Sequence, residues 1–538
     1  MCCEIFPPIP HHESNPAFLL FGNRLYSDQS PTEFLIELLL VTHSPKRIGA
    51  TGAPFDSPLP EFGTLAAWTD TVGLQYAPKA RLNLKLFAFM GASRLDSRHE
   101  THREHYKELV ETLRNSVRVT EGGTEEDVLR TLENLFLGFQ GAGSGRTWCA
   151  QSFLPVCRGL LAGETIWNET AARRSPPHDW NYLLGRQQEY LTMNKHRFLA
   201  RGGELMFLQM CNALRQSPAT IRAWAEQSDV CLESQELDPA WLHAELQREL
   251  GKLLDQCPQT LTEIADFLDS GIEPETARAT DSDNGGPRYV DAGWCAAESW
   301  REGYLFAVEL LRLCTADLDV VKRLRLLEAA CAMQVLRSLA AQSARHCPAE
   351  RAVAWPGYRL AVSAPVEDKP AVKRISRHTA KVAERLIYHA LRSGDVPLPD
   401  DATQRDKTLR EADRRYGGKL FSGLAKRIGF LIPRRGAGVR FTLNEQLLRL
   451  LVVTTVPVGG RLTYDRFKAL VEARHGLVFD ANGFARADQW TGGTGRVSFG
   501  NDLDAWFQDM LAAAGLLVHL SDSCALVENP AVKRGANS

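Results

Sequence analysis

Apolar residues recur at helical spacing along most of the chain. Ser30 and Glu33 stand in the spacing of a capping box, with a proline at the first helical position between them. The apolar run at 35–40 that follows is dense enough for a buried helix. Two further helices are expected between 296 and 345, with a break near 315–317. This pattern predicts a mainly α protein.

Helices, turns and two short strands follow one another in the last hundred residues. Thr442 and Glu445 have capping-box spacing for a first helix. Thr463 is expected to start a second helix, which ends at Gly476. A polar, glycine-rich insertion is expected from there to Gly500.

The end of the chain predicts a third helix and a hairpin. Asn501 is expected to cap the helix, and Gly515 to stop it. The segments 516–520 and 524–528 flank a Ser-Asp-Ser turn and predict the two strands of a wing. Together with the preceding helices they predict a C-terminal winged-helix (α+β) domain on a helical body.

Breaks in the pattern divide the chain into several units, which is expected for 538 residues. The fold class is therefore multidomain. The expected units are an N-terminal mostly helical domain at 1–120, a helical domain at 121–275, a long-helix domain at 289–368, a basic helical segment at 369–440 and the winged-helix domain at 441–538.

The composition is that of a globular protein, with 44% hydrophobic and 24% charged residues. The twelve cysteines are scattered and include no CxxC pair, which is typical of a reduced, cytoplasmic protein without a zinc site. The N-terminal stretch lacks the pattern of a secretory signal, and no apolar run approaches the roughly 20 residues of a membrane span. We expect a cytoplasmic location, no membrane contact and no cofactor.

Charge is distributed unevenly along the chain. Residues 369–440 hold 18 lysines and arginines against 7 aspartates and glutamates, a net charge of +11. The rest of the chain holds 45 basic and 58 acidic residues, a net charge of −13. A basic zone of this density indicates a surface for a polyanion, and nucleic acid is the usual one. A solvated face, or docking onto the chain's own acidic helices, is the alternative.

The expected nucleic-acid-binding residues are the lysines and arginines of this zone, with two from the winged helix: Lys373, Arg374, Arg377, Lys381, Lys426, Arg427, Arg434, Arg435, Arg440, Arg466 and Lys468. Lys369 and Arg385 extend the same basic helix face. By contrast, no lysine or arginine occurs from 497 to 532, where Asp502, Asp504 and Asp509 lie on the third winged-helix helix. That acidic surface favours a winged helix that binds protein.

The glycine-rich stretch at 140–149 is the main enzyme candidate. It approaches a phosphate-binding loop, but Gln140 replaces the first glycine and Arg146 the lysine. The preceding segment is an amphipathic helix and not a strand, so a helix–helix turn is the simpler interpretation. Thr147 would be the magnesium ligand if the loop did bind a nucleotide.

Other chemical candidates have simpler explanations. Cys149 and Cys295 each follow a tryptophan, and a buried tryptophan that packs beside an inert thiol explains both pairs. His99, His102 and His105 lack the HExxH spacing of a zinc peptidase. The "ARGGEL" stretch, with Arg201 and Glu204 around two glycines, is typical of a turn with a local ion pair. We therefore expect no catalytic residue and no metal ligand.

The stretches "RTWCAQSFLP" and "ARGGEL", with a C-terminal winged helix on a large helical body, resemble uncharacterised accessory proteins of bacterial anti-phage defence islands. The resemblance implies a subunit that works beside a separate ATPase, helicase or nuclease, and it transfers no catalytic residues.

Three functions stay open from the sequence. The first is a non-enzymatic DNA-associated subunit of a defence complex, with the 369–440 zone on phosphate. The second is a protein–protein adaptor with an interaction-type winged helix. The third is a degenerate nucleotide-binding enzyme that uses the 140–149 loop.

Overall fold

The computed structural model describes most of the chain, and all structural statements below refer to these residues. They are 3–10, 15–22, 25, 27, 29–68, 71–79, 81, 83–84, 87, 100–120, 122–137, 157–163, 166–167, 169–178, 182, 190–192, 202–255, 259–270, 289–346, 355–367, 369–495, 503–521 and 524–530.

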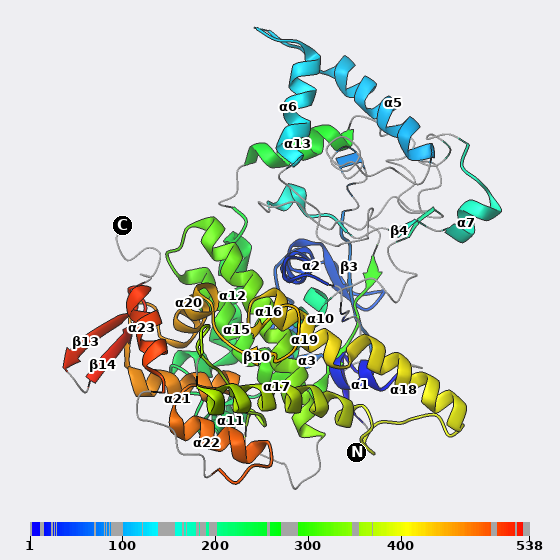
Figure 1. Cartoon of the computed structure of the whole chain (residues 1–538). Helices are drawn as coiled ribbons and strands as arrows, with labels where there is room; N and C mark the ends of the chain where they lie inside the picture. Colours follow the sequence, from blue (N-terminus) through cyan, green and yellow to red (C-terminus); the bar gives the residue numbers. More distant parts are fainter. Residues whose placement is uncertain are drawn as a thin grey trace.

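The protein is mainly helical, as the hydrophobic pattern predicted. Figure 1 shows the helices gathered in a body, with α5 and α6 at one end and the C-terminal hairpin at another. The helices of the first half are α1 (Pro16–Phe21), α2 (Pro31–His43), α3 (Phe62–Ala67), α5 (Glu100–Ser116), α6 (Glu125–Leu137), α7 (Glu169–Arg174), α10 (Gly202–Leu214), α11 (Pro218–Ser228), α12 (Pro239–Lys252) and α13 (Gln259–Ser270).

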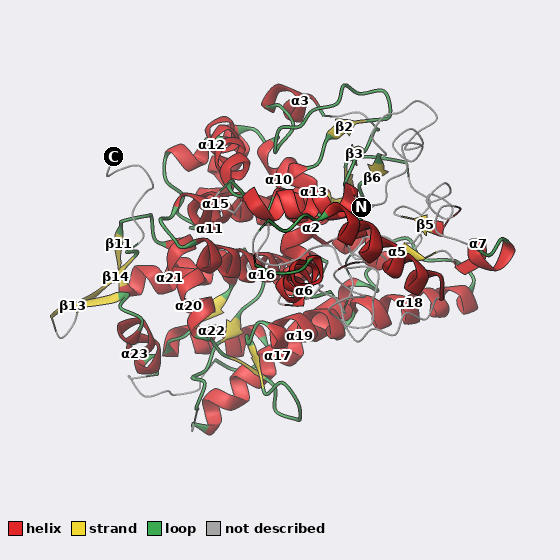
Figure 2. Cartoon of the chain, turned by 90° about the horizontal axis from the view of Figure 1, so that it is seen from above, coloured by secondary structure: helices red, strands yellow, loops and turns green. Residues whose placement is uncertain are grey.

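The second half is also built from helices, of which α17 and α18 lie at the periphery (Figure 2). They are α15 (Trp300–Thr315), α16 (Val320–Arg345), α17 (Pro370–Ala390), α18 (Ala402–Tyr416), α19 (Gly418–Arg427), α20 (Glu445–Thr455), α21 (Tyr464–His475), α22 (Ala481–Trp490) and α23 (Ala505–Ala513). Short 3₁₀ turns occur at Arg158–Leu160 (η1), Gln235–Leu237 (η2) and Ala297–Ser299 (η3).

The strands are short and pair in small sheets. In chain order they are β1 (Ile5–Phe6), β2 (Lys46–Ile48), β3 (Leu74–Tyr76), β4 (Ile166–Trp167), β5 (Leu191–Thr192), β6 (Val290–Asp291), β7 (Cys295–Ala296), β8 (Leu360–Ala361), β9 (Leu431–Ile432), β10 (Arg440–Phe441), β11 (Arg461–Thr463), β12 (Leu477–Val478), β13 (Leu517–Ser521) and β14 (Cys524–Glu528). Three-stranded sheets have the orders β2-β3-β6 and β11-β14-β13.

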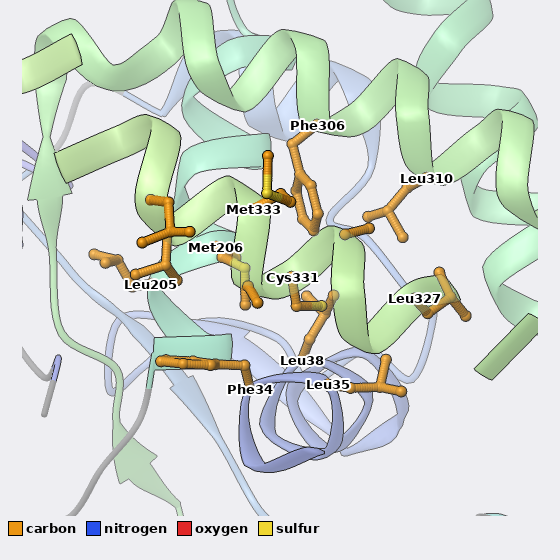
Figure 3. Close-up of a cluster of buried hydrophobic side chains, with 14 of the residues drawn as sticks. Phe34, Leu35, Leu38, Leu205, Met206, Phe306, Leu310, Leu327, Cys331 and Met333 are labelled. Carbon is orange, nitrogen blue, oxygen red and sulfur yellow. The ribbon is translucent and has the colours of Figure 1, made fainter. Parts of the chain in front are cut away.

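The centre of the body is the packing of α2, α10, α15 and α16, whose apolar side chains meet in Figure 3. The predicted capping box starts α2: Ser30 accepts from the amide of Glu33, whose carboxylate accepts from the amide of Ser30. Helix α10 approaches α2 closely because it begins with glycine. A β-carbon at Gly203 would lie 2.2 Å from the backbone nitrogen of Leu38.

The residues of the "ARGGEL" stretch from Gly202 on are therefore the start of a buried helix. Glu204, expected in a turn with Arg201, is buried and accepts hydrogen bonds from the Tyr76 hydroxyl at 2.9 Å and the Gly293 amide at 2.6 Å. Arg201 lies outside the described residues, so the ion pair stays a prediction. The break between the two helices at 296–345 is confirmed, since α15 ends at Thr315 and α16 begins at Val320.

The C-terminal elements differ from the prediction in three places. Helix α23 begins at Ala505, next to Asp504 and not to the expected cap Asn501, which lies outside the described residues. Asn444, and not Thr442, caps α20, because its side chain accepts from the Leu447 amide and donates to the carbonyl of Ile428. The segment expected to be a polar insertion contains β12 and α22, which Asp480 caps. The second helix and the hairpin are confirmed: α21 runs from its Thr463 cap to a left-handed Gly476, and β13 pairs with β14.

The C-terminal elements join the body through a buried polar network. Arg312 of α15 pairs with Glu236 through two hydrogen bonds of 2.7 Å and donates to the carbonyls of Thr454 and Thr455 in α20. Arg474 of α21 donates to the same Thr454 carbonyl and to two carbonyls that follow α11. Strand β12 also pairs in parallel with β8. The predicted domain boundaries stay predictions, and one apolar cluster runs from Phe6 to Val527.

Candidate nucleic-acid interface

Helix α17 carries the densest part of the basic zone on one face. Proline at its first position and apolar residues at helical spacing explain why it forms. Its buried face packs against α16, α19 and α22, and consists of Val372, Ile375, Ser376, Thr379, Ala380, Val382, Ala383, Leu386, Ile387 and Ala390. The opposite face is left for solvent.

That solvent face is cationic. Arg374, Arg377, Lys381 and Arg385 are exposed, and Lys373 beside them is half-buried. Steps of three and four residues place the four exposed cations on one side of the helix. Since an α-helix rises 1.5 Å per residue, they extend over about 17 Å.

The loop between β9 and β10 completes the cationic surface. It spans 433–439 and exposes Arg434 and Arg435. Gly436 and Gly438 have φ angles of 96° and 82°, which allow the loop to turn back. A β-carbon at Gly438 would lie 3.1 Å from a terminal nitrogen of Arg377, so the loop lies directly against α17. We call the face of α17 and this loop together the α17–loop surface.

Arg440 has a supporting position behind the loop. Its guanidinium donates to the Ser363 hydroxyl and to the carbonyls of Ala364 and Pro365, each at 2.8 Å. Burial lowers the pKa of Arg440; the carboxylate of Glu367 acts in the opposite direction, and the charge of Arg377 lowers the pKa further. The side chain therefore fixes the base of the loop, and its donors are occupied inside the protein.

Acidic groups near the α17–loop surface are few. Glu367, just before α17, is buried, accepts a hydrogen bond from the Lys369 amide and lies near Arg440. Glu384 is the acidic residue of α17; burial raises its pKa, and it lies beside Ser422 and Lys426 of α19. Arg392, just after the helix, pairs with Asp413 of α18. Within the described residues, no ion pair is recorded for the six exposed cations of the surface. Their charge is therefore available to a ligand.

Three other predicted residues already have partners. Arg427 donates to the backbone carbonyls of Ser27 and Gln29. Arg466 forms a two-pronged pair with Asp229, with both distances 3.0 Å. Lys468 lies 2.7 Å from Asp504 and 3.2 Å from both Asp465 and Asp480. The structure thus does not join Arg466 and Lys468 to the basic surface, and their role in binding stays a prediction.

The C-terminal hairpin has the opposite character. Val518 and Leu520 of β13 are 40% and 61% exposed. Helix α23 shows Asp509 and small apolar residues to solvent. Asp504, expected on the same acidic surface, is buried and pairs with Lys468, and Asp502 lies outside the described residues. The two hairpins of the second half therefore differ: the β9–β10 loop is cationic, whereas the β13–β14 hairpin is apolar.

The remaining chemical candidates give no site in the described part of the chain. The 140–149 loop, Cys149 and His99 lie outside the described residues, as do the side chains of His102 and His105. Cys295 is buried, as expected, and burial raises its pKa to about 12. No group of residues that could hold a metal ion, and no helix long and apolar enough to cross a membrane, is found among the described residues.

No protein-family model, no curated protein and no solved structure matches the chain. The arguments below therefore rest on the residues of this chain.

Proposed function

We propose that the chain is a non-enzymatic DNA-associated subunit of a multi-protein bacterial anti-phage defence complex, and that the α17–loop surface contacts phosphate. The observation that carries the DNA contact is the convergence of six exposed cations from two separate segments, α17 and the 433–439 loop. The defence setting rests on the sequence resemblance alone.

The geometry suits a phosphate backbone better than a single acidic protein side chain. Duplex DNA carries one negative charge per about 1.7 Å of axis, so about 17 Å of helix face can meet several phosphates. Six neutralised phosphates give a slope of about −5 for the logarithm of affinity against the logarithm of salt concentration. Affinity then falls about a thousandfold between 50 and 200 mM salt.

Fluorescence anisotropy with a labelled random duplex tests the proposal. The double variant Arg434→Glu/Arg435→Glu changes two exposed side chains for which no internal hydrogen bond or ion pair is recorded among the described residues, so the fold should be kept. We expect it to weaken binding at every DNA sequence and to reduce the salt slope by about 2.

The matched control is Lys107→Glu/Lys252→Glu, which makes the same change in net charge on α5 and α12, away from the α17–loop surface. It should bind DNA nearly as the parent does. Equal loss of affinity in both double variants would mean that net charge alone drives binding, and unchanged affinity in the first would remove the site assignment.

A protein-interaction role for the C-terminal elements accompanies this function. We infer that 441–538 is a winged helix with β12 and α22 inserted, supported by the sheet order β11-β14-β13 and by the helix before the hairpin. The exposed Val518 and Leu520 favour a protein partner there, such as an ATPase, helicase or nuclease subunit. If the protein does not bind DNA, the protein–protein adaptor function remains, with the exposed β13–β14 hairpin as its contact surface.

A further inference from the structure

A thiol, an imidazole and a carboxylate meet where the N-terminal segment crosses the end of α16. The Cys3 sulfur lies 4.0 Å from Nε2 of His346 and 3.9 Å from the backbone carbonyl oxygen of Asp395, to which the thiol can also donate. Nδ1 of the same ring lies 3.1 Å from Oδ2 of Asp395. The three residues are far apart in the sequence. Their order, thiol to imidazole to carboxylate, is that of a nucleophile, its base and the group that orients the base.

Each residue is held by a defined element. Strand β1 pairs with β7, and the Ala297 amide donates to the carbonyl of Glu4 at 2.8 Å, which fixes the chain next to Cys3. His346 is the C-terminal cap of α16, a helix of 26 residues. Asp395 lies in the turn that follows α17. The arrangement therefore depends on three elements of the body.

The hydrogen bonds select the tautomer that a thiol needs. Nδ1 faces a carboxylate, which requires a proton on Nδ1, so Nε2 is the acceptor in the neutral ring. The side-chain amide of Gln342 lies 3.4 Å from Nε2, which agrees with Nε2 as the acceptor; this amide shares the single lone pair of Nε2 with the Cys3 thiol and must give way when Nε2 takes the thiol proton. The hydrogen bond from His346 lowers the pKa of Asp395, so this carboxylate is ionised at neutral pH.

Two features favour proton transfer from Cys3 to His346. The carboxylate of Asp395 faces the ring at Nδ1, and the ring lies at the C-terminal end of α16, where the helix carries partial negative charge. A thiolate beside an imidazolium is the activated form of a cysteine nucleophile. Cys3 is also partly exposed, whereas Cys211, Cys295 and Cys331 are buried and burial raises the pKa of each thiol.

We propose that Cys3, His346 and Asp395 form a nucleophilic centre for acyl transfer, with the carbonyl carbon of an ester or thioester as its electrophile. The presence of an imidazole beside the thiol favours acyl transfer, rather than oxidation of the thiol, as the reaction of this centre. Acyl transfer needs a base and then an acid at one position, and an oriented histidine supplies both. This centre is independent of the α17–loop surface: it replaces the non-enzymatic part of the proposed function and leaves the proposed DNA contact unchanged.

The reaction balances with water as the only co-reactant. Nε2 of His346 takes the thiol proton, the thiolate adds to the carbonyl carbon, and the bond to the leaving oxygen or sulfur breaks as Nε2 returns the proton to it. Water, deprotonated by Nε2, then attacks the acyl-Cys3 thioester. The C–S bond breaks, Nε2 returns the proton to the Cys3 sulfur, and the carboxylic acid leaves. Asp395 stays ionised throughout and is a positioning residue.

The first test measures thiol reactivity in the full chain. Iodoacetamide labelling, read peptide by peptide by mass spectrometry across pH 5–9, compares Cys3 with Cys524, a thiol of the same partial exposure without a recorded imidazole contact among the described residues. We expect Cys3 to react about ten times faster at pH 7, since an ordinary thiol is only a few per cent ionised there. His346→Ala should abolish that difference, and Asp395→Asn should reduce it and shift the pH profile upward.

The second test uses p-nitrophenyl acetate as the acyl donor. We expect one equivalent of p-nitrophenolate in a burst and an acetyl group on Cys3, both lost in Cys3→Ala and slowed at least tenfold in His346→Ala. Cys524→Ala is the control and should retain the burst. A Cys3 that reacts no faster than Cys524, an adduct confined to another cysteine, or alkylation without acylation would each overturn the proposal.

Discussion

Removing the carboxylate of Glu236 should destabilise the protein strongly. Glu236 and Arg312 are both buried, and two hydrogen bonds of 2.7 Å join them. In Glu236→Ala, Arg312 keeps only its carbonyl acceptors in α20. The guanidinium of Arg474 lies close enough that Arg312 contributes, after burial, to lowering the pKa of Arg474 to about 10. The variant thus removes the carboxylate that pairs with Arg312 and that also acts on the neighbouring Arg474, for which Glu309 remains as the nearby carboxylate.

The expected loss follows from that arrangement. Breaking a buried ion pair by removing one partner costs about 3–5 kcal/mol. A second cation at the same site puts Glu236→Ala in the upper half of that range, about 4 kcal/mol. Urea titration followed by tryptophan fluorescence and by circular dichroism measures the free energy of unfolding. Coincidence of the two curves shows whether a single transition is being measured.

Two controls make the result interpretable. Glu245→Ala removes an exposed carboxylate from its pair with Arg248 on α12, and should cost at most about 1 kcal/mol. The double variant Glu236→Leu/Arg312→Met removes both charges and should be more stable than Glu236→Ala, because no uncompensated charge remains at Arg312. A Glu236→Ala protein within about 1 kcal/mol of the parent would refute the reasoning.

Three further predictions concern pH, packing and surface. His475 is fully buried beside Glu309, and burial lowers its pKa to about 4. The free energy of unfolding should therefore keep the full contribution of this residue above pH 6.5 and fall by about 3 kcal/mol as the pH drops to 4. Calorimetry at a series of pH values measures this fall, which should be smaller in His475→Gln. Gly203→Ala should lower the free energy of unfolding by about 1–3 kcal/mol in the same assay, because the added β-carbon clashes with the backbone of α2. Leu520→Ser, at a side chain 61% exposed, should change stability by less than about 0.5 kcal/mol.

Local signals in the sequence were sufficient for much of the fold. The Ser30 capping box, the break after Thr315 and the Thr463–Gly476 helix each depend on residues within one or two turns of each other, and the structure confirms them. Thr442 was the wrong cap because a distant contact decides between two suitable side chains. Asn444 bonds to the carbonyl of Ile428 in addition to capping α20.

Helix α22 was missed for a different reason. Phe484, Ala487 and Trp490 are buried at a spacing of three residues, but the glycines that follow at 492–495 dominate the composition of the segment. The buried face of this helix is stabilised by contacts with α17 and β8, which no local pattern reveals.

The candidate sites show the same limit. Charge density located α17 and the 433–439 loop, yet it could not separate Arg434, which is exposed, from Arg440, which is bonded behind the loop. The centre at Cys3 has no signal in the sequence at all. His346 is 343 residues away along the chain, and only the folded body brings the two together.

The shared acceptor at Thr454 has a consequence for how the chain can vary. The hydrophobic pattern places a boundary near 441, where a recombination event would exchange one tail for another. Arg312 precedes that boundary in the sequence and Arg474 follows it, and both donate to the Thr454 carbonyl. Strand β12, after the boundary, pairs with β8, before it. A C-terminal region from another protein would need an arginine and a backbone carbonyl at the positions of Arg474 and Thr454. Exchange of the region after 441 for that of another protein should therefore disrupt these contacts. In relatives of this protein, substitutions at 236, 312 and 474 should occur together.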